Sequence, residues 1–350
     1  MIIRKAYKFK LKASHEIEEK LSQFSGCCRF VWNKALALNM KRLEEKQPIM
    51  WYQELSFWLT FWKSTEEHHF LKDCHSQVLQ QTLKNLERAF KDAFDKTQKN
   101  KRLPNFKRKF CSDSFRYPQG FKFENRRVFL PKIGWVSYRK SREIEGTPKN
   151  ITVKWESDGW YFSVQTELEV EDPIHSSKSM VGIDMGISRF ATLSTGEYIE
   201  PLNALKKEQV KLANAQRKLA RQEKKSNNWK IQKKEIGKIH RKIRNSRNDF
   251  LHKTSTAISK NHGVVFVEAL RISNMSASAK GTIDEPGKNV KAKAGLNRSI
   301  LDQAWGLFRS QLEYKLAWLG GELRYVDPKY SSQRCPNCKT IDSENRKSQS

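Results

Sequence analysis

Two acidic residues each stand at the end of a short apolar run. Asp184 follows Val181-Gly182-Ile183, and Glu268 follows Val264-Val265-Phe266-Val267. Short runs rich in β-branched residues are typical of buried strands. A buried strand end is a costly place for a charge unless the carboxylate meets a metal ion or a donor. The pair therefore predicts a magnesium-dependent site for phosphodiester cleavage, with Asp184 and Glu268 as catalytic residues and metal ligands.

The two carboxylates by themselves leave alternatives open. An aspartate can simply hold a turn, and Gly182 and Gly186 around Asp184 also fit the first phosphate turn of an actin-like ATPase. An ATPase of that class needs further glycine-rich phosphate loops downstream, and we find none with suitable flanks. A two-ion nuclease site normally uses three or more acidic side chains, and two are clear in this sequence. Glu268 stands at the end of a second apolar run. This position favours the nuclease, because a sheet can bring two strand ends together so that their carboxylates share metal ions.

A second candidate metal site is the run Cys335-Pro336-Asn337-Cys338. Two cysteines at this spacing form one knuckle of a zinc site. A structural zinc ribbon needs four ligands, and within the 350 residues neither a second pair nor a histidine follows Cys338. A thioredoxin-like redox pair is disfavoured because no βαβ pattern surrounds the run. We interpret Cys335 and Cys338 as half of a zinc ribbon.

Charge is the strongest constraint on the partners of the chain. The formal net charge is +29 and the sequence pI is near 9.9. A surplus on this scale indicates a polyanion, most often nucleic acid, and argues against an enzyme of small metabolites. Residues 203–253 concentrate the surplus, with 17 Lys and Arg against 4 Asp and Glu. Since acidic partners are too few to compensate these cations, the segment predicts a helical surface for nucleic acid.

The sequence indicates neither a membrane segment nor an export signal. No apolar run approaches the ~20 residues of a membrane span. Residues 1–10 alternate charged and apolar side chains and lack the continuous apolar stretch of a signal peptide. We expect a cytoplasmic protein that associates with the nucleoid through DNA. Its cysteines at 27, 28, 74 and 111 are then reduced thiols in core or incidental positions.

The spacing of apolar residues predicts the elements that must position these groups. Residues 2–12 alternate like a strand, Ser14 fits a helix N-cap, and helical stripes follow over 17–38 and 79–93. Residues 104–170 have the aromatic residues and regular turn signals of a small antiparallel barrel, including a hairpin between Trp155 and Trp160. The remaining predictions are a helical hairpin over 203–253 that bends at Ser226-Asn227-Asn228, a loop over 276–298, a helix over 299–319 and a strand over 323–326.

Together these features resemble the TnpB proteins of bacterial insertion sequences, which are also called OrfB transposases, and the related compact type V CRISPR effectors. The resemblance covers nearly the whole chain, and the order of its motifs is more specific than any single one. The motifs are AYKFKL at 6–11, GCCRFVWN at 26–33, PNFK at 104–107, SFRY at 114–117, LPKIG at 130–134, GIDMG at 182–186, FLHK at 250–253, DQAWG at 302–306, and the run from Val326-Asp327-Pro328 to Cys338.

The resemblance implies an α+β protein of several domains. An oligonucleotide-binding-like β-barrel, the wedge domain, would comprise residues 1–13 plus 104–172. A helical recognition domain, residues 14–103, would be inserted in it. An RNase H-like (RuvC) α/β domain would span 178–334 and carry the basic hairpin 203–253. Residues 335–350 would begin a zinc ribbon.

The activity that the resemblance implies is magnesium-dependent cleavage of target DNA, directed by a guide RNA from the transposon end, with no small-molecule substrate and no membrane partner. Asp184 corresponds to the first RuvC carboxylate, Glu268 to the second, and Cys335 with Cys338 to the first zinc knuckle.

The family pattern continues into a second cysteine pair and a third catalytic aspartate. Asp342 and Glu344 stand in the wrong context to replace that aspartate. From the sequence we therefore expect a C-terminally truncated chain that is inactive or nearly so as a nuclease. The alternative function is that of a cleavage-deficient RNA- and DNA-binding remnant or an RNA-guided binder.

Overall fold

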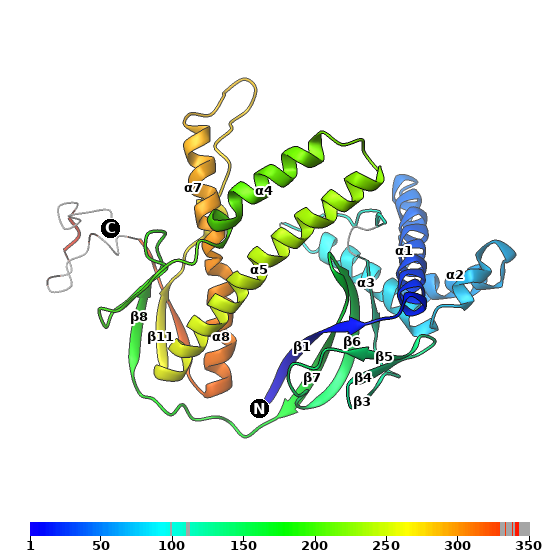
Figure 1. The fold of residues 1–350 in the computed structure, drawn as a ribbon, viewed down its shortest axis with the longest axis horizontal. Helices are drawn as coiled ribbons and strands as arrows, with labels where there is room; N and C mark the ends of the chain where they lie inside the picture. Colours follow the sequence, from blue (N-terminus) through cyan, green and yellow to red (C-terminus); the bar gives the residue numbers. More distant parts are fainter. Residues whose placement is uncertain (99, 110–112, 330–332, 334–337, 339, 343–350) are drawn as a thin grey trace. The chain divides into compact units, whose positions relative to one another are not determined.

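The computed structural model describes residues 1–98, 100–109, 113–329, 333, 338 and 340–342. The chain divides into two compact units, Met1–Val170 and Glu171–Ser350 (Figure 1). Within these described ranges, no helix has the length and apolar character needed to cross a membrane.

Unit 1 contains a seven-stranded antiparallel sheet with the order β2-β6-β7-β1-β5-β4-β3. The first strand lies inside this sheet, paired with β7 and β5, although more than 100 residues separate it from the other strands. The predicted hairpin is confirmed, with Trp155 opposite Trp160. The strands are β1 Ile2–Lys12, β2 Ser114–Tyr117, β3 Lys122–Glu124, β4 Arg127–Leu130, β5 Gly134–Tyr138, β6 Thr147–Glu156 and β7 Gly159–Glu169.

The sheet of unit 1 is strongly curled. Phe123 on β3 and Phe162 on β7 stand four strands apart in the sheet order, which in a flat sheet would separate them by about 19 Å. Their ring centroids are 6.0 Å apart, because the sheet bends back on itself around a shared aromatic core. The segment predicted as a small antiparallel barrel thus forms, together with β1, a curled sheet whose order ends at β2 and β3 among the described strands.

Three α-helices of unit 1 lie between β1 and β2 in the chain. Ser14 caps the first of them, its side chain accepting a hydrogen bond from Ile17 N at 3.4 Å, as predicted. The helices pack against the inner sheet face, with ring centroids of Phe24 and Phe115 5.6 Å apart, and share one hydrophobic core with it. The helices are α1 His15–Glu44, α2 Tyr52–Ser64 and α3 Ser76–Phe94, with a 3-10 segment η1 Glu66–Lys72.

Unit 2 contains a five-stranded mixed sheet with the order β10-β9-β8-β11-β12. Strands β8, β11 and β12 run parallel, whereas β9 and β10 are antiparallel to their neighbours. The strands predicted around Asp184, Glu268 and 323–326 are confirmed. Their bounds are β8 Met180–Asp184, β9 Ala191–Leu193, β10 Tyr198–Ile199, β11 Val264–Glu268 and β12 Glu322–Val326.

Helices cover one face of this sheet. Val181, Ile183, Val265 and Val267 point into a core built with α5 and α8, while alternate residues point to the other face. The helices are α4 Ala204–Ala220, α5 Asn227–Asn261, α6 Ile272–Met275, α7 Val290–Gln303 and α8 Trp305–Leu319.

Three local predictions in unit 2 were wrong. The hairpin bends at 221–226, and Ser226 begins the second helix as its N-cap, accepting from Trp229 N at 3.2 Å. The predicted loop over 276–298 contains the first part of α7. The predicted single helix over 299–319 breaks at Ala304, whose φ is +55°.

Candidate active site

The sheet of unit 2 brings Asp184 and Glu268 together. In the parallel pair of β8 and β11, Ile183 lies opposite Val267. Each carboxylate is the next residue along its strand, so the two end neighbouring strands at the same level and project from the same face. This is the face that the helices of the unit leave open. In the chain, β8 and β11 are separated by 79 residues that include both helices of the hairpin. The two carboxylates are therefore neighbours only through the parallel pairing of their strands.

A groove of about 350 Å³ opens beside these carboxylates. Asp184 is exposed and Glu268 half-buried at its edge, while β9 and β12 supply its sides. Its floor is mostly apolar, because Gly182, Phe266 and Val326 are among the residues that line it. The lining residues are Gly182, Ile183, Asp184, Thr192, Leu193, Ser194, Phe266, Val267, Glu268 and Val326.

The turn that follows Asp184 is held by hydrogen bonds on both sides. Gly182 N donates to Ser194 Oγ at 3.0 Å, and Ser194 N donates to Gly182 O at 2.9 Å. Gly186 N donates to Phe190 O at 3.3 Å. A Cβ added at Gly186 would lie 2.9 Å from the Arg189 carbonyl oxygen, so the close approach of the backbone requires glycine. The turn thus has little freedom to move Asp184.

Beneath that turn lies an aromatic cluster. The Phe190 ring is fully buried, and its centroid lies 5.0 Å from those of Phe250 on α5 and Phe308 on α8. Tilted and edge-on aromatic pairs of this kind add to the energy of burial. The cluster supports the Asp184 turn from the core side of the sheet.

The donor set at the groove suits a hard cation in part. Two carboxylates at adjacent strand ends match the oxygen ligands that Mg²⁺ prefers. Within the described ranges, no group of three or more His, Cys, Asp or Glu side chains is arranged to hold a metal ion. The third carboxylate that such sites normally use is therefore not supplied by the described residues.

The cysteines that the structure describes lie in the core of unit 1 and near the end of the chain. Cys27, Cys28 and Cys74 are buried in the core of unit 1, which agrees with the predicted core role. Cys338 is exposed. Cys335, Cys111 and Glu344 lie outside the described residues.

The outer face of the unit 1 sheet is basic and polar. A hollow of about 280 Å³ crosses β1, β2, β6 and β7 there. Asn150 donates to Gln165 at 3.0 Å across the hollow, and hydrogen bonds from Lys149 and Arg4 hold the pKa of Glu167 below its ordinary value. The lining residues are Arg4, Lys5, Ala6, Arg116, Asn150, Thr152, Ser163 and Gln165.

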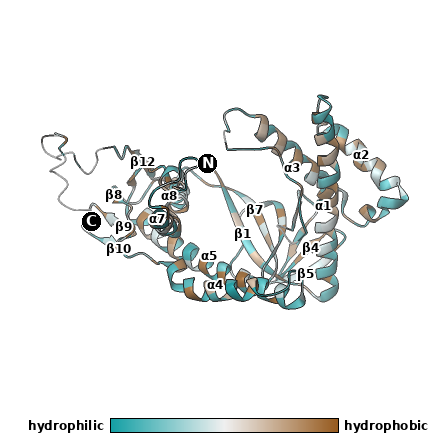
Figure 2. Ribbon diagram, turned by 90° about the horizontal axis from the view of Figure 1, so that it is seen from above, coloured by the Kyte–Doolittle hydropathy of each residue, from teal (hydrophilic) through white to brown (hydrophobic). Residues whose placement is uncertain are grey.

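The hairpin of α4 and α5 presents a second basic surface, and Figure 2 shows hydrophilic residues along much of both helices. A small apolar core that includes Leu212, Ile239 and Ile243 joins the two helices. The Lys242 side chain pairs with Glu208 between the helices and lowers the pKa of that carboxyl. The exposed cations of the hairpin are Lys206, Lys207, Lys211, Arg217, Lys218, Arg221, Lys224, Lys225, Lys230, Lys233, Lys234, Lys238, Lys242, Arg244, Lys253 and Lys260.

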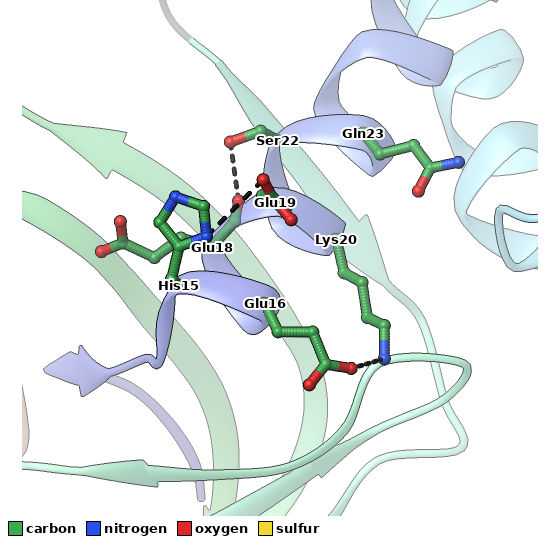
Figure 3. Close-up of a pocket in the computed structure, with 7 residues that line it drawn as sticks. All are labelled: His15, Glu16, Glu18, Glu19, Lys20, Ser22 and Gln23. Carbon is green, nitrogen blue, oxygen red and sulfur yellow. Dashed lines mark hydrogen bonds and ion pairs between the residues drawn. The ribbon is translucent and has the colours of Figure 1, made fainter.

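A larger hollow, of about 610 Å³, lies against the first turns of α1 (Figure 3). Carboxylates dominate its lining, and Glu16 pairs with Lys20 at 2.7 Å. The hydrogen bond and charge of Lys20 lower the pKa of Glu16. This open stretch of one helix brings no residues from other elements together, so we assign it no function.

Sequence reasoning missed Asp302 as a structural residue of unit 2. It is a buried carboxylate that contacts α4 and α5 from the end of α7. The one signal in the sequence was its place in the motif over 302–306, because nothing local reveals partners 55 and 97 residues away.

Comparisons with known families identify three segments of the chain. A model described as "Probable transposase", OrfB of IS605, matches residues 163–279. A model described as a helix-turn-helix domain of the same OrfB group matches residues 1–48, where the structure has β1 and the single long helix α1. A Cas12f1-like TNB domain model matches residues 305–349.

Named relatives match almost the entire chain. "Putative RNA-guided DNA endonuclease InsQ" of Escherichia coli (strain K12) is 50% identical over 99% of this chain and 86% of that protein. A "Putative RNA-guided DNA endonuclease" of Streptomyces pristinaespiralis is 34% identical over 97% of this chain and 81% of its own length. A cryo-EM structure of a Cas12f1–sgRNA–target DNA complex aligns with a TM-score of 0.49 at 14% identity, over 98% of this chain and 92% of that one, a likeness too low to bear on function.

Proposed function

The chain belongs to the OrfB family of RNA-guided DNA endonucleases, and from this premise we propose that it binds a guide RNA and a target DNA and that Asp184 and Glu268 form its nuclease site. The observation that carries the assignment is the placement of two carboxylates at neighbouring parallel strand ends beside an open groove. Unit 2 would then be the RNase H-like domain expected from the sequence.

The residues at this groove would hold Mg²⁺ through carboxylate oxygens. When bound, the metal would make a coordinated water more acidic and offset charge on the scissile phosphate. Asp184 and Glu268 supply the negative oxygens, and the hydrogen-bonded turn between Gly182 and Ser194 fixes one of them in place. The rest of the lining adds only uncharged side chains to the two carboxylates. The phosphate and water molecules would therefore have to complete the coordination.

The two basic surfaces fit the backbone of nucleic acids. The sheet face of unit 1 combines cations with short polar side chains such as Thr152 and Ser163, which suits the phosphates and 2′-hydroxyls of RNA. The hairpin adds a line of exposed cations in unit 2. We propose that the guide RNA occupies the first surface and that the hairpin contacts the sugar–phosphate backbone of guide or target.

Salt dependence tests these two surfaces. We expect the affinity for a fluorescein-labelled structured RNA to fall steeply with salt, because binding to phosphates releases counterions. Replacing Lys206, Lys207, Lys211 and Lys218 by Gln should flatten the slope of log affinity against log salt by roughly 0.7–0.9 for each phosphate that the hairpin no longer binds. The matched control replaces Lys20, Lys41, Lys63 and Lys72 of unit 1 by Gln. An unchanged slope in the hairpin variant would exclude the hairpin from the interface.

Cleavage is a separate question from binding. A second candidate function, guided binding without cutting, is favoured by the observation that the described residues gather two carboxylates and no third. We expect a polypeptide of these 350 residues to bind RNA and matched DNA but to cleave a matched plasmid slowly or not at all. Mg²⁺-dependent cleavage that Asp184→Asn abolishes and Glu313→Gln preserves would establish the nuclease and reject the binder.

We further propose that Cys335 and Cys338 are two of the four ligands of a zinc ribbon. Two thiolates bind zinc too weakly to retain it through dialysis against a competing chelator. Metal analysis of the monomeric 350-residue polypeptide should find well under one zinc per chain after such dialysis. One retained zinc per chain, lost in Cys338→Ser, would mean that further ligands complete the site.

A further inference from the structure

Asp302, at the end of α7, joins three helices of unit 2. Its side chain is only 5% exposed. Leu205 N, at the start of α4, donates to both of its carboxylate oxygens at 3.1 and 3.0 Å. Arg247 of α5 donates to Oδ1 at 2.6 Å. One carboxylate therefore satisfies an orphan amide at a helix start and neutralises a half-buried guanidinium.

Two residues after Asp302, Ala304 interrupts the helix in an unfavourable backbone conformation. Ala304 separates α7 from α8 with φ +55° and ψ +41°, a left-handed conformation that Cβ makes costly. Alanine is also the best helix former, and the flanking spacing predicts one continuous helix over 299–319. Local preferences thus favour a straight helix, and tertiary contacts must hold the bend. The contacts of Asp302 stand two residues before it.

The far side of the break reaches the candidate active site. Trp305 and Phe308, in the first turn of α8, are 2% and 0% exposed. The Phe308 ring lies 5.0 Å from that of Phe190, whose carbonyl accepts from Gly186 N in the turn after Asp184. A continuous set of contacts therefore runs from the basic hairpin through Asp302 and the bend to the Asp184 turn.

We propose that Asp302 is a positioning residue: its contacts with Leu205 and Arg247 hold the bend at Ala304, and the bend sets the Asp184 turn and the hairpin in one fixed arrangement. Its relevance to nucleic acids rests on the proposed function, whereas the positioning itself does not. When the contacts of Asp302 are weakened, Ala304 changes from the left-handed towards the helical conformation. Helix α8 then shifts against Phe190, and the Asp184 turn becomes less rigid.

Hydrogen exchange of the protein without nucleic acid tests the positioning. In Asp302→Asn, which keeps the size of the side chain and removes its charge, peptides covering 185–199 should exchange about tenfold faster, the factor set by the cost of a left-handed alanine. The matched control is Asp249→Asn, which removes the charge of an exposed α5 carboxylate paired with Lys253 and should leave these peptides unchanged. Equal exchange at 185–199 in Asp302→Asn and the unmodified protein would overturn the proposal.

A second variant separates positioning from a merely structural loss. In Asp302→Asn with Ala304→Gly, glycine adopts the left-handed conformation without the Cβ penalty, so exchange at 185–199 should return towards that of the unmodified protein. If Asp302 only stabilised unit 2, the added glycine would weaken the helices further and accelerate exchange throughout the unit. That result would reject the bend as the coupling element.

Affinity for a fluorescein-labelled RNA duplex tests whether the positioning by Asp302 matters for nucleic-acid binding, which is the part of the proposal that rests on the proposed function. Asp302→Asn should weaken binding by about threefold or more, and Ala304→Gly should restore it, because coupling through a packed junction is of this order. Changed exchange with unchanged RNA affinity would keep the positioning role and reject the hairpin as an RNA surface. Changed affinity with unchanged exchange would reject the positioning role.

Discussion

Replacing Asp184 by Asn should stabilise the metal-free protein. Asp184 and Glu268 end adjacent parallel strands, which lie about 4.8 Å apart, so their carboxylates are held roughly 6 Å from each other. At an effective dielectric constant of about 60, two exposed charges at that distance repel by about 1 kcal/mol. Physiological salt, with a screening length near 8 Å, reduces this to about 0.5 kcal/mol. For a unit of this size the gain corresponds to a Tm rise of roughly 1–2 °C.

Magnesium should reverse the relative stability of the two proteins, so that the unmodified protein becomes more stable than Asp184→Asn. An ion that binds the native site with millimolar affinity stabilises it by about 1.4 kcal/mol when present at tenfold excess over Kd. The unmodified protein should gain this stabilisation in about 10 mM Mg²⁺, and Asp184→Asn should gain little, because one of two ligands has lost its charge. Thermal unfolding in EDTA and in Mg²⁺ measures both effects.

The control for this experiment is Glu313→Gln, which removes an exposed carboxylate from α8 in the same unit. It should shift Tm equally in EDTA and in Mg²⁺, which accounts for the general effect of lowering negative charge. The site assignment would be refuted if Asp184→Asn unfolded at a lower temperature than the unmodified protein in EDTA, or if Mg²⁺ stabilised both proteins equally.

Three further results are expected. Phe190→Ala should lower the free energy of unfolding by about 3–5 kcal/mol in a urea titration, because it empties the centre of the aromatic cluster. Gly186→Ala should remove the Mg²⁺-induced Tm shift, since the new Cβ meets the Arg189 carbonyl oxygen and displaces the Asp184 turn. Burial lowers the pKa of Lys315 to about 8, so between pH 8 and 10.5 the unfolded chain binds more protons and stability should rise with pH. Urea titrations across that range should show the rise abolished in Lys315→Met and kept in Lys260→Met.

The strands that carry the candidate site were predictable because their apolar runs are short, β-branched and ended by a charge. The pairing of β8 with β11 was not contained in either run. It depends on the parallel register that places Ile183 opposite Val267, across 79 intervening residues that neither run describes. Sequence reasoning thus predicted that Asp184 and Glu268 share one site, and the structure supplies their common level and face.

The wrong predictions of the hairpin bend and of a continuous helix over 299–319 also have physical causes that local sequence does not contain. The triplet Ser226-Asn227-Asn228 has turn-forming residues, but serine and asparagine are equally good helix starters, and here Ser226 caps α5. The bend at Ala304 contradicts the helix preference of alanine and the apolar spacing over 299–319, and Asp302, two residues before it, has partners in distant segments. The predicted domain limits at 13, 103 and 172 stay predictions, since the helices and the sheet of unit 1 share one core.

The place of β1 in unit 1 has a consequence for synthesis on the ribosome. The Met1 amino group donates to Val170 O at 2.5 Å, and β1 pairs with β7 along most of its length, from Ile2 opposite Glu169 to Lys10 opposite Tyr161. The first strand therefore finds this partner 151 to 167 positions later. At about 5–20 residues per second, roughly 10–30 s pass between the emergence of the two strands. During that interval the first strand can pair with β5 at Leu11, but the buried residue Phe9 lacks its partner strand β7. We expect the nascent chain to depend on a holding chaperone until β7 is released, after which the first strand closes the sheet.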